Sequence, residues 1–274
     1  MNREHWEEQI MKKNILIAAV VTTLLGAGIA AYLSWQHQPK LEPAHVQALP
    51  PPASKPVVQQ VIETAPAQPP LPKLSESDKF IQNTLAGLVG NNSLMKLFYT
   101  ERIIHNIVAT IDNLPRERVP LKVMPVKPVL GMFITEGPEG DKTISPKNAA
   151  RYAVYVRIAE AIDAQKLVEV YVRLYPLFQQ AYEEIGYPKN YFNDRLLVAL
   201  DNLLAAPDLK KPVKLDQPHV LYNFADSDLE ARSAGQKILM RMGSKNEAKI
   251  KARLREIKQQ VMLHMHDKKV GSTE

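Results

Sequence analysis

The stretch Ile15–Leu33 limits most strongly what this chain can fold into. It reads "ILIAAVVTTLLGAGIAAYL", and no charged residue occurs between Lys13 and Lys40. At about 1.5 Å per residue, a helix over this stretch is about 28 Å long, which is close to the thickness of the hydrocarbon core of a bilayer. The sequence therefore predicts one transmembrane helix over residues 15–35, preceded by a short segment over residues 1–14.

The charges that flank this span predict its orientation. Arg3, Lys12 and Lys13 precede it, whereas only Lys40 follows it closely. Because basic flanks stay in the cytoplasm, we expect residues 1–14 to be cytoplasmic. In a bacterium the rest of the chain would then lie in the periplasm, and the protein would be a single-pass protein of the inner membrane.

A cleaved signal peptide is the alternative interpretation of this segment. Its apolar core would be shorter, about 7 to 15 residues, and its leader would be basic. Here the acidic residues Glu4, Glu7 and Glu8 interrupt the leader. We therefore favour a retained anchor.

Small side chains recur along the predicted span with a period of four residues. Such a row lines one face of a helix and permits close approach of a second helix. It makes a homodimer through the span a candidate, although small residues are also common in spans without that role. The row consists of Ala18, Thr22, Gly26 and Ala30.

The segment that follows the predicted span is rich in proline. Ten of the 21 prolines fall between Pro39 and Pro72, and such composition favours extended conformations over a packed core. We expect a disordered linker over residues 36–73. A ligand role for its Pro-x-x-Pro pieces is the weaker alternative to a spacer.

Apolar residues spaced three and four apart predict a mainly α domain over residues 74–267, with a disordered tail over residues 268–274. We expect six to seven helices and a small β-hairpin or extended insertion between Pro115 and Ser145. Ser227–Glu230 and Ser244–Glu247 both read S-x-x-E and are candidate capping boxes. The first predicted helix begins near Ser75, and the last two follow the capping boxes. The helices between them are predicted from Leu94 to Ile111, from Ser145 to Ile162, around Tyr171–Ile185 and from Phe192 to Pro207.

The segment "LYPLFQQAYEEIGYP", residues 174–188, lies on a predicted helical stripe. Because tyrosine can bury its ring and leave its hydroxyl at the edge, we interpret the stripe as a core wall rather than a ligand site. Glu183 and Glu184 are successive, so they point about 100° apart on a helix and cannot form an acid/base pair. The stripe consists of Tyr171, Leu174, Phe178, Tyr182 and Ile185, and Tyr175 extends it.

This segment also carries a resemblance to a known family. Together with "IVATIDNLP", "ARY", "FNDRL", "SDLE" and "QKILMRMGSKN", it resembles a family of proteobacterial single-span proteins that carry a domain of unknown function, number three thousand and fourteen. The resemblance covers most of residues 71–261 and implies a fold unit without implying an activity. Where the family has a proline near the C-terminus, this chain has Ser244, and both residue types can begin a helix.

Four charged residues form a candidate polar cluster with a structural role. Asp112 ends a predicted helix, where the helix dipole disfavours an acid. We expect it to bond to the following backbone or to pair with Arg102 or Arg151, and a catalytic or ligand-binding role is the weakest alternative. Asp201 shares a helix face with leucines, so we expect it beside a basic partner.

The last predicted helix carries a strongly basic face. Residues 232–269 contain eleven Lys and Arg against three acids, a net charge of +8. The simpler interpretation is that this face is only solvated. The more specific alternative is that it binds an anionic lipid or a cell-wall polymer. We expect Ile250, Leu254, Ile257, Val261 and Met265 to face inward. The outward residues, of which all but Lys251 are candidates for binding, are Lys245, Lys249, Lys251, Arg253, Arg255 and Lys258.

No motif in the sequence predicts an enzyme, a metal or a cofactor. The chain has no cysteine, the spacing of His264 and His266 places them on different sides of a helix, and the common phosphate, hydrolase and zinc motifs do not occur. We expect a binding or assembly module for an envelope partner. The alternatives are a cell-wall hydrolase, which a cleft with two carboxylates or a histidine and an acid would favour, and an inverted cytoplasmic regulator that binds nucleic acid.

Overall fold

The computed structural model describes residues 59–61, 70–90 and 92–268, all of which belong to one compact unit, Pro56–Glu274. The predicted transmembrane helix, its small-residue face and residues 1–14 lie outside these ranges. Among the described residues, no helix combines the length and the apolar character needed to cross a membrane.

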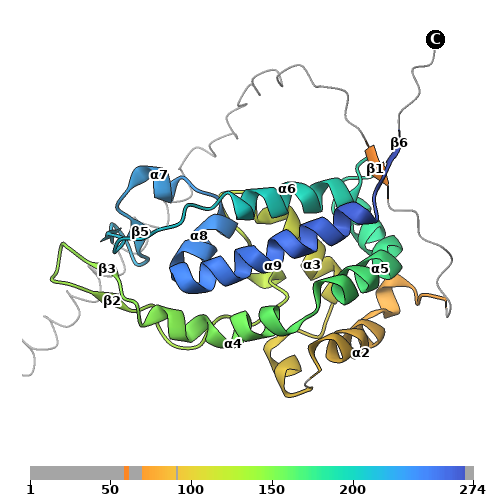
Figure 1. Ribbon diagram of the computed structural model, residues 1–274, viewed down its shortest axis with the longest axis horizontal. Coiled ribbons are helices and arrows are strands. Elements are labelled where there is room, and N and C mark those ends of the chain that lie inside the picture. The colour runs from red at the N-terminus through yellow and green to blue at the C-terminus, as the bar shows by residue number, and fades with distance from the viewer. Residues whose placement is uncertain (1–58, 62–69, 91, 269–274) are drawn as a thin grey trace, which may run out of the picture. The chain divides into compact units, whose positions relative to one another are not determined.

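The described part of the chain is mainly helical, as predicted, and contains eight α-helices (Figure 1). One more helix forms than the sequence predicted, because α7 and α8 are separate. The described residues also form three short 3-10 helices: Leu74–Glu76 before α2, Asn92–Leu97 between α2 and α3, and Leu121–Val123 between α3 and α4. The α-helices are α2 (Asp78–Val89), α3 (Ile103–Asn113), α4 (Asn148–Ala161), α5 (Ala164–Glu184), α6 (Phe192–Leu204), α7 (Ser227–Glu230), α8 (Ala234–Arg241) and α9 (Ser244–Leu263).

In the ranges that the structure describes, six short strands form three antiparallel pairs. The predicted hairpin is present as β2 (Thr135–Glu136) and β3 (Thr143–Ile144). A second hairpin, β4 (Leu215–Asp216) with β5 (Asn223–Phe224), forms between α6 and α7 and was not predicted. The third pair joins β1 (Gln59–Val61), within the stretch expected to be linker, to β6 (His266–Lys268).

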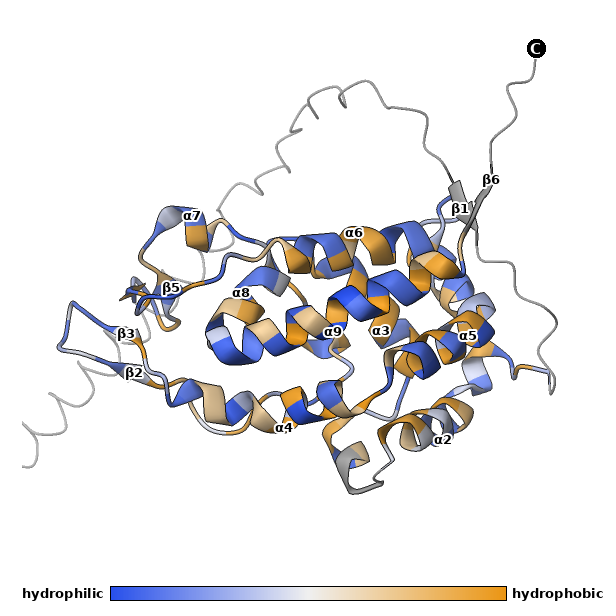
Figure 2. Cartoon of the chain, in the orientation of Figure 1, coloured by the Kyte–Doolittle hydropathy of each residue, from blue (hydrophilic) through white to orange (hydrophobic). Residues whose placement is uncertain are grey.

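The C-terminal helix α9 runs through the middle of the helical assembly (Figure 1). It packs against α4, α5, α6 and α8. Figure 2 shows hydrophilic and hydrophobic residues alternating along it. Neighbouring helices therefore flank α9 on several sides, while one face of it stays exposed, at positions that include Lys245, Lys249, Ala252, Arg255 and Gln259.

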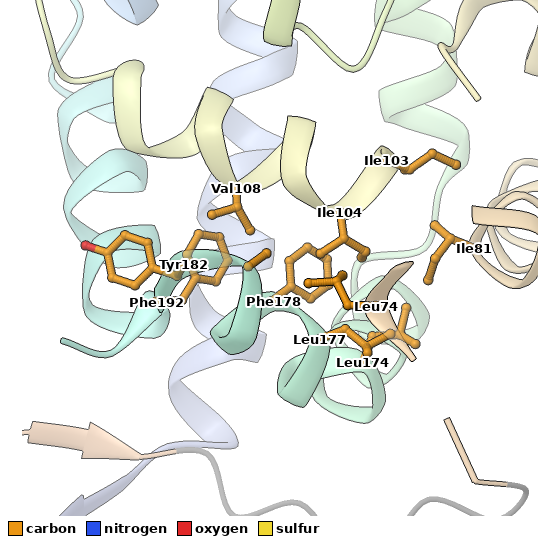
Figure 3. Close-up of a cluster of buried hydrophobic side chains, with 11 residues drawn as sticks. Leu74, Ile81, Ile103, Ile104, Val108, Leu174, Leu177, Phe178, Tyr182 and Phe192 are labelled. Atoms are coloured by element: carbon orange, nitrogen blue, oxygen red, sulfur yellow. The ribbon is translucent and has the colours of Figure 1, made fainter. Parts of the chain in front are cut away.

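The main core lies between α2, α3, α5 and α6 (Figure 3). Phe192, which begins α6, is fully buried, and its ring stacks on that of Phe178 at 5.7 Å between centroids. Leu174, Phe178 and Tyr182 of the predicted stripe are buried, and Tyr171 packs against them. Ile185 is 37% exposed, because α5 ends at Glu184 and the chain turns away at Gly186, whose φ is +113°.

The second predicted helix is interrupted between Leu97 and Ile103. Arg102 takes a left-handed conformation with φ of 50°. The carboxylate of Asp78, from α2, accepts hydrogen bonds from the backbone N–H groups of Arg102 and Ile103 at 2.7 and 2.9 Å. The start of α3 is thus capped by a side chain from another helix. Local periodicity could not reveal this break.

Both predicted capping boxes are wrong. Asp226 caps α7 by accepting from two backbone N–H groups, and Ser233 caps α8 by accepting from Gln236 N. Ser244 is already inside α9, whose N-cap is Gly243. The Glu that was expected to complete the second box, Glu247, is instead buried at 1% exposure.

Candidate functional site

A polar cleft of about 500 Å³ opens where the end of α3 meets the connection between α5 and α6. The connection contributes residues that end the "YPLFQQAYEEIGYP" segment and begin the next helix. Two segments distant in sequence, residues 112–116 and 182–198, thus form one site. The lining residues are Asp112, Arg116, Tyr182, Tyr187, Lys189, Asn190, Tyr191, Asp194, Arg195 and Val198.

Asp112 lies at the base of this cleft with its side chain 7% exposed. Its Oδ2 is 2.9 Å from Nη2 of Arg116, and its Oδ1 is 2.9 Å from Nε of Arg195. Its backbone oxygen accepts from Arg116 Nε at 3.2 Å and from Arg195 Nη2. The two guanidinium groups thus enclose the last turn of α3 and offset an acid at the negative end of the helix dipole.

Arg116 connects this ion pair to the tyrosines of the cleft. Its Nη2 donates to Tyr187 Oη at 2.7 Å, and its side chain is 49% exposed. The attraction of Asp112 raises the pKa of Arg116, an effect that burial opposes and Tyr187 reinforces. Arg116 is therefore a fixed cation that still faces solvent.

Two stacked tyrosine rings join the core to the cleft. The rings of Tyr182 and Tyr187 are 4.6 Å apart at an angle of 18°. In Figure 3 Tyr182 lies at one end of the buried cluster, with its hydroxyl directed away from it. Burial, and then the charge of Asp112, raises the pKa of the Tyr182 hydroxyl, so it remains a neutral hydrogen-bonding group at physiological pH.

The charge balance of the cleft favours an anionic ligand. Three basic side chains, of Arg116, Lys189 and Arg195, face two acidic ones, of Asp112 and Asp194. The carboxylate of Asp112 is already engaged by both arginines. Lys189 is exposed and, within the described ranges, makes no ion pair. The open side of the cleft therefore presents positive charge beside aromatic rings.

The structure does not bring the four residues of the predicted polar cluster together. Arg102 begins α3 at its opposite end from Asp112. Arg151 donates to the backbone oxygens of Leu130 and Gly131. Asp201 pairs with Lys258, so it does have the basic partner that was expected. Asp112 alone belongs to the cleft.

Most of the predicted basic face of α9 is used inside the domain. Lys249 pairs with Glu160 at 3.0 Å, Arg253 donates to the backbone oxygen of Glu160, and Lys258 pairs with Asp201. Lys245 and Arg255 are exposed. These contacts arise because helices α4 and α6 flank α9, and their residues Glu160 and Asp201 meet its basic side chains.

Lys251 was expected to point outward but is buried. Its Nζ is 2.9 Å from Oε1 of Glu247 and 2.6 Å from Oδ1 of Asp208, and it also donates to the backbone oxygen of Ala206. Burial lowers the pKa of Lys251, but the bonds to Asp208 and Glu247 raise it more, so the net shift is upward. Lys251 therefore ties α9 to the segment that follows α6.

Sequence reasoning missed Arg116, Tyr187, Lys189 and Arg195. The spacing of Asp112 and Arg116, four residues, is that of a helical ion pair and could have indicated one partner. Arg195 gives no such signal, because it lies 83 residues from Asp112 along the chain. Only the packing of α3 on α6 brings the two together.

A second hollow contains a histidine and an acid. His105 Nε2 is 2.8 Å from Oε2 of Glu184, and Lys73 and Ser75 also line this hollow. The hydrogen bond from His105 lowers the pKa of Glu184. No group of three or more metal-ligating side chains occurs within the ranges that the structure describes.

The architecture defines a helical domain with a polar, net basic cleft. Residues 103–258, more than half of the chain, match the family described as protein of unknown function (DUF3014). The chain therefore belongs to this family, as its motifs indicated. No curated protein and no solved structure matches it. The family match includes every residue that lines the cleft.

Proposed function

We propose that this chain is a binding module that captures an anionic group, a carboxylate or a phosphate, in the cleft beside α3. The observation that carries the proposal is the half-exposed guanidinium of Arg116, held in place by Asp112 and Tyr187. Arg116 uses Nε and Nη2 for these bonds, and within the described ranges Nη1 makes none. A preorganised guanidinium is well suited to oxyanions.

The neighbouring residues would complete such a site. Lys189 could add a second positive charge at the rim, and Tyr187 and Tyr191 could offer ring faces and hydroxyls. Because the guanidinium is already ordered, a ligand loses little affinity to the cost of ordering it. An acidic envelope polymer or the carboxylate of an envelope protein would supply the required chemistry.

We place this module in the cell envelope of a bacterium, anchored in the inner membrane. The support is in the sequence: the uncharged apolar stretch Ile15–Leu33 and the basic residues that precede it. The linker would hold the domain in the periplasm, near its ligand.

Binding should depend on the two exposed cations of the cleft. In the full chain, solubilised in neutral detergent, we expect carboxylates and phosphate monoesters to give saturation-transfer NMR signals, and neutral sugars to give none. Lys189→Gln should weaken binding about tenfold, since a hydrogen bond to a charged group contributes roughly 1.5–3 kcal/mol. Because Lys189 is exposed, its replacement should leave stability unchanged.

Lys245→Gln is the matched control, because Lys245 is also exposed but lies at the start of α9, outside the cleft. Its affinity should equal that of the wild-type protein. Equal binding of neutral sugars, or an equal loss in both variants, would contradict the proposed site.

A hydrolase is the second candidate function, because Asp112 and Asp194 line the same cleft. Its weakness is that two guanidinium groups engage Asp112, so this carboxylate would have to give up an ion pair to accept a proton. A hydrolase would release a product, whereas a binding module would not. Release of soluble fragments from purified cell wall by the full chain, abolished by Asp194→Asn, would support the hydrolase over a module that only binds.

The placement predicts the location of the C-terminus. A phosphatase that is active only outside the cytoplasm should be active when fused after Glu274, because the basic residues before the span remain inside. Activity of a reporter restricted to the cytoplasm would instead support the inverted regulator.

A further inference from the structure

The guanidinium group of Arg116 has one nitrogen left for a ligand. A free guanidinium presents two edges, Nε with Nη2 and Nη1 with Nη2, and each edge can hold a carboxylate with two parallel hydrogen bonds. Asp112 occupies the first edge, because Nε donates to its backbone oxygen at 3.2 Å and Nη2 to its Oδ2 at 2.9 Å. Nη2 also donates to the hydroxyl of Tyr187 at 2.7 Å. Both edges are therefore engaged.

Tyr187 is held in this position from two sides. Its ring stacks on that of Tyr182, which belongs to the buried core. Its hydroxyl also lies 3.5 Å from Oδ2 of Asp112. A planar carboxylate that approached the edge formed by Nη1 and Nη2 of Arg116 would have to displace this hydroxyl to form two parallel bonds. The arrangement therefore disfavours the geometry in which arginine binds carboxylates most strongly.

The second arginine of the cleft is less accessible. Arg195 directs Nε to Oδ1 of Asp112 at 2.9 Å and donates from Nη2 to the backbone oxygen of the same residue. Its side chain is 21% exposed, whereas that of Arg116 is 49% exposed. Arg195 therefore contributes charge to the base of the cleft, and Arg116 is the guanidinium that a ligand meets.

The other donors of the cleft come from separate side chains. Lys189, Asn190 and Tyr191 line it together with Arg116, and within the described ranges the side chains of these three form no hydrogen bond. A phosphate monoester has three acceptor oxygens that point in different directions, so each can accept from a different donor. The two oxygens of a carboxylate lie in one plane. Separate donors around a single guanidinium nitrogen therefore suit the tetrahedral group.

We infer that the cleft selects phosphate monoesters over carboxylates. Nη1 of Arg116, the ammonium of Lys189 and the hydroxyl of Tyr191 donate to separate phosphate oxygens, and Tyr187 excludes the carboxylate. This inference rests on the proposed function and narrows its ligand from oxyanions in general to one class. Charge acts in the same direction, because a net positive cleft attracts a dianion about twice as strongly as a monoanion at the same distance.

Glycerol 3-phosphate and glycerate are matched probes, because they carry a phosphate and a carboxylate on similar three-carbon groups. NMR titration of the full chain in neutral detergent measures both dissociation constants. At pH 7.5 we expect glycerol 3-phosphate to bind about tenfold more tightly. Its affinity should be about fourfold lower at pH 5.5, because the second pKa of a phosphate monoester is about 6. The carboxyl pKa of glycerate is about 3.5, so its affinity should not change.

The ligand, and not the cleft, should cause this pH dependence. No histidine occurs among the described residues that line the cleft. Carboxylates ordinarily titrate near pH 4 and tyrosine, lysine and arginine at about pH 10 or above, outside the range of the experiment. The titratable side chains that face the ligand are those of Asp112, Arg116, Tyr182, Tyr187, Lys189, Tyr191, Asp194 and Arg195.

Tyr187→Phe tests the exclusion of carboxylates directly. The variant keeps the ring that stacks on Tyr182 and frees one N–H of Nη2, while Asp112 still holds Arg116. We expect glycerate to bind about threefold more tightly, the effect of one added hydrogen bond. The preference for glycerol 3-phosphate should fall by at least the same factor.

Tyr155→Phe is the matched control, because this hydroxyl donates to the backbone oxygen of Lys127 and lies outside the cleft. Its preference should equal that of the wild-type protein. Equal affinity for the two probes, a phosphate affinity that does not change with pH, or a preference unaltered in Tyr187→Phe would each overturn the inference and leave an oxyanion site in place. Failure of both probes to bind would instead contradict the proposed function.

The phosphate could belong to a soluble ester or to a lipid headgroup, and one further titration distinguishes them. Phosphatidic acid added to the detergent micelles presents the same phosphate monoester on a lipid. Competition with glycerol 3-phosphate would assign the ligand to a lipid, and a lack of competition would assign it to a soluble ester.

Discussion

Replacing Phe192 with alanine is expected to lower the free energy of unfolding by about 3–5 kcal/mol, the usual cost of removing a buried phenylalanine side chain. Phe192 is fully buried, and its ring contacts those of Tyr171, Phe178 and Tyr182. No small rearrangement can fill the space that it leaves, because three rings border it. Urea denaturation of the domain, followed by circular dichroism, measures the loss.

Val198→Ala is the control for this variant, because Val198 lies on the same helix but is 50% exposed. Its cost should be no more than about 0.5 kcal/mol. If Phe192→Ala cost as little as Val198→Ala, the rings would not form the core, and the tyrosine segment would have to be reconsidered as a binding surface.

Replacing Lys251 with methionine is expected to cost about 3–5 kcal/mol, because it leaves Glu247 buried without its cation. The side chain of Glu247 is 1% exposed and that of Lys251 is 4% exposed. The double variant Glu247→Leu with Lys251→Met removes both charges and should recover most of the loss. A double variant as unstable as the single one would show that Lys251 acts through Asp208 and Ala206 instead.

The loss should also depend on pH. Burial raises the pKa of Glu247, which the bond from Lys251 only partly opposes, and removing Lys251 should raise that pKa further. An acid with a raised pKa in the folded state binds its proton more tightly there, so the folded state gains stability as pH falls through that pKa. The deficit of Lys251→Met should therefore be smaller at pH 4 than at pH 7. A deficit that grew on acidification would contradict this assignment.

The sequence predicted a helix correctly where its boundaries depend on residues within the helix or next to it. The apolar spacing of α6 and the proline after it placed this helix correctly, since both act within a few residues. The break before α3 depends on Asp78, which belongs to another helix. The separation of α7 from α8 depends on the N-cap at Ser233. The sequence did not single out this serine, because the serines at positions 227 and 244 looked like equally good helix starts.

The cleft was less predictable than the fold. An acid at a helix C-terminus needs compensation, so Asp112 was expected to bond to the backbone or to pair with Arg102 or Arg151; it pairs with Arg116 and Arg195 instead. Its partner Arg195 comes from α6, and only tertiary packing joins the two. The basic face of α9 shows the opposite error. Its periodicity was visible, but the acids that meet it, such as Glu160, come from neighbouring helices.

The pairing of β1 with β6 gives the domain a defined response to mechanical load. Gln59 lies opposite Lys268, and Val61 lies opposite His266, so the incoming and outgoing ends of the chain leave the ladder at the same end. A force between the linker and anything attached to the C-terminus would open this pair like a zipper, one bridge at a time. A pair of three-residue strands is weak by itself. It would yield before the helices, so that the cleft keeps its shape while the connection lengthens under tension.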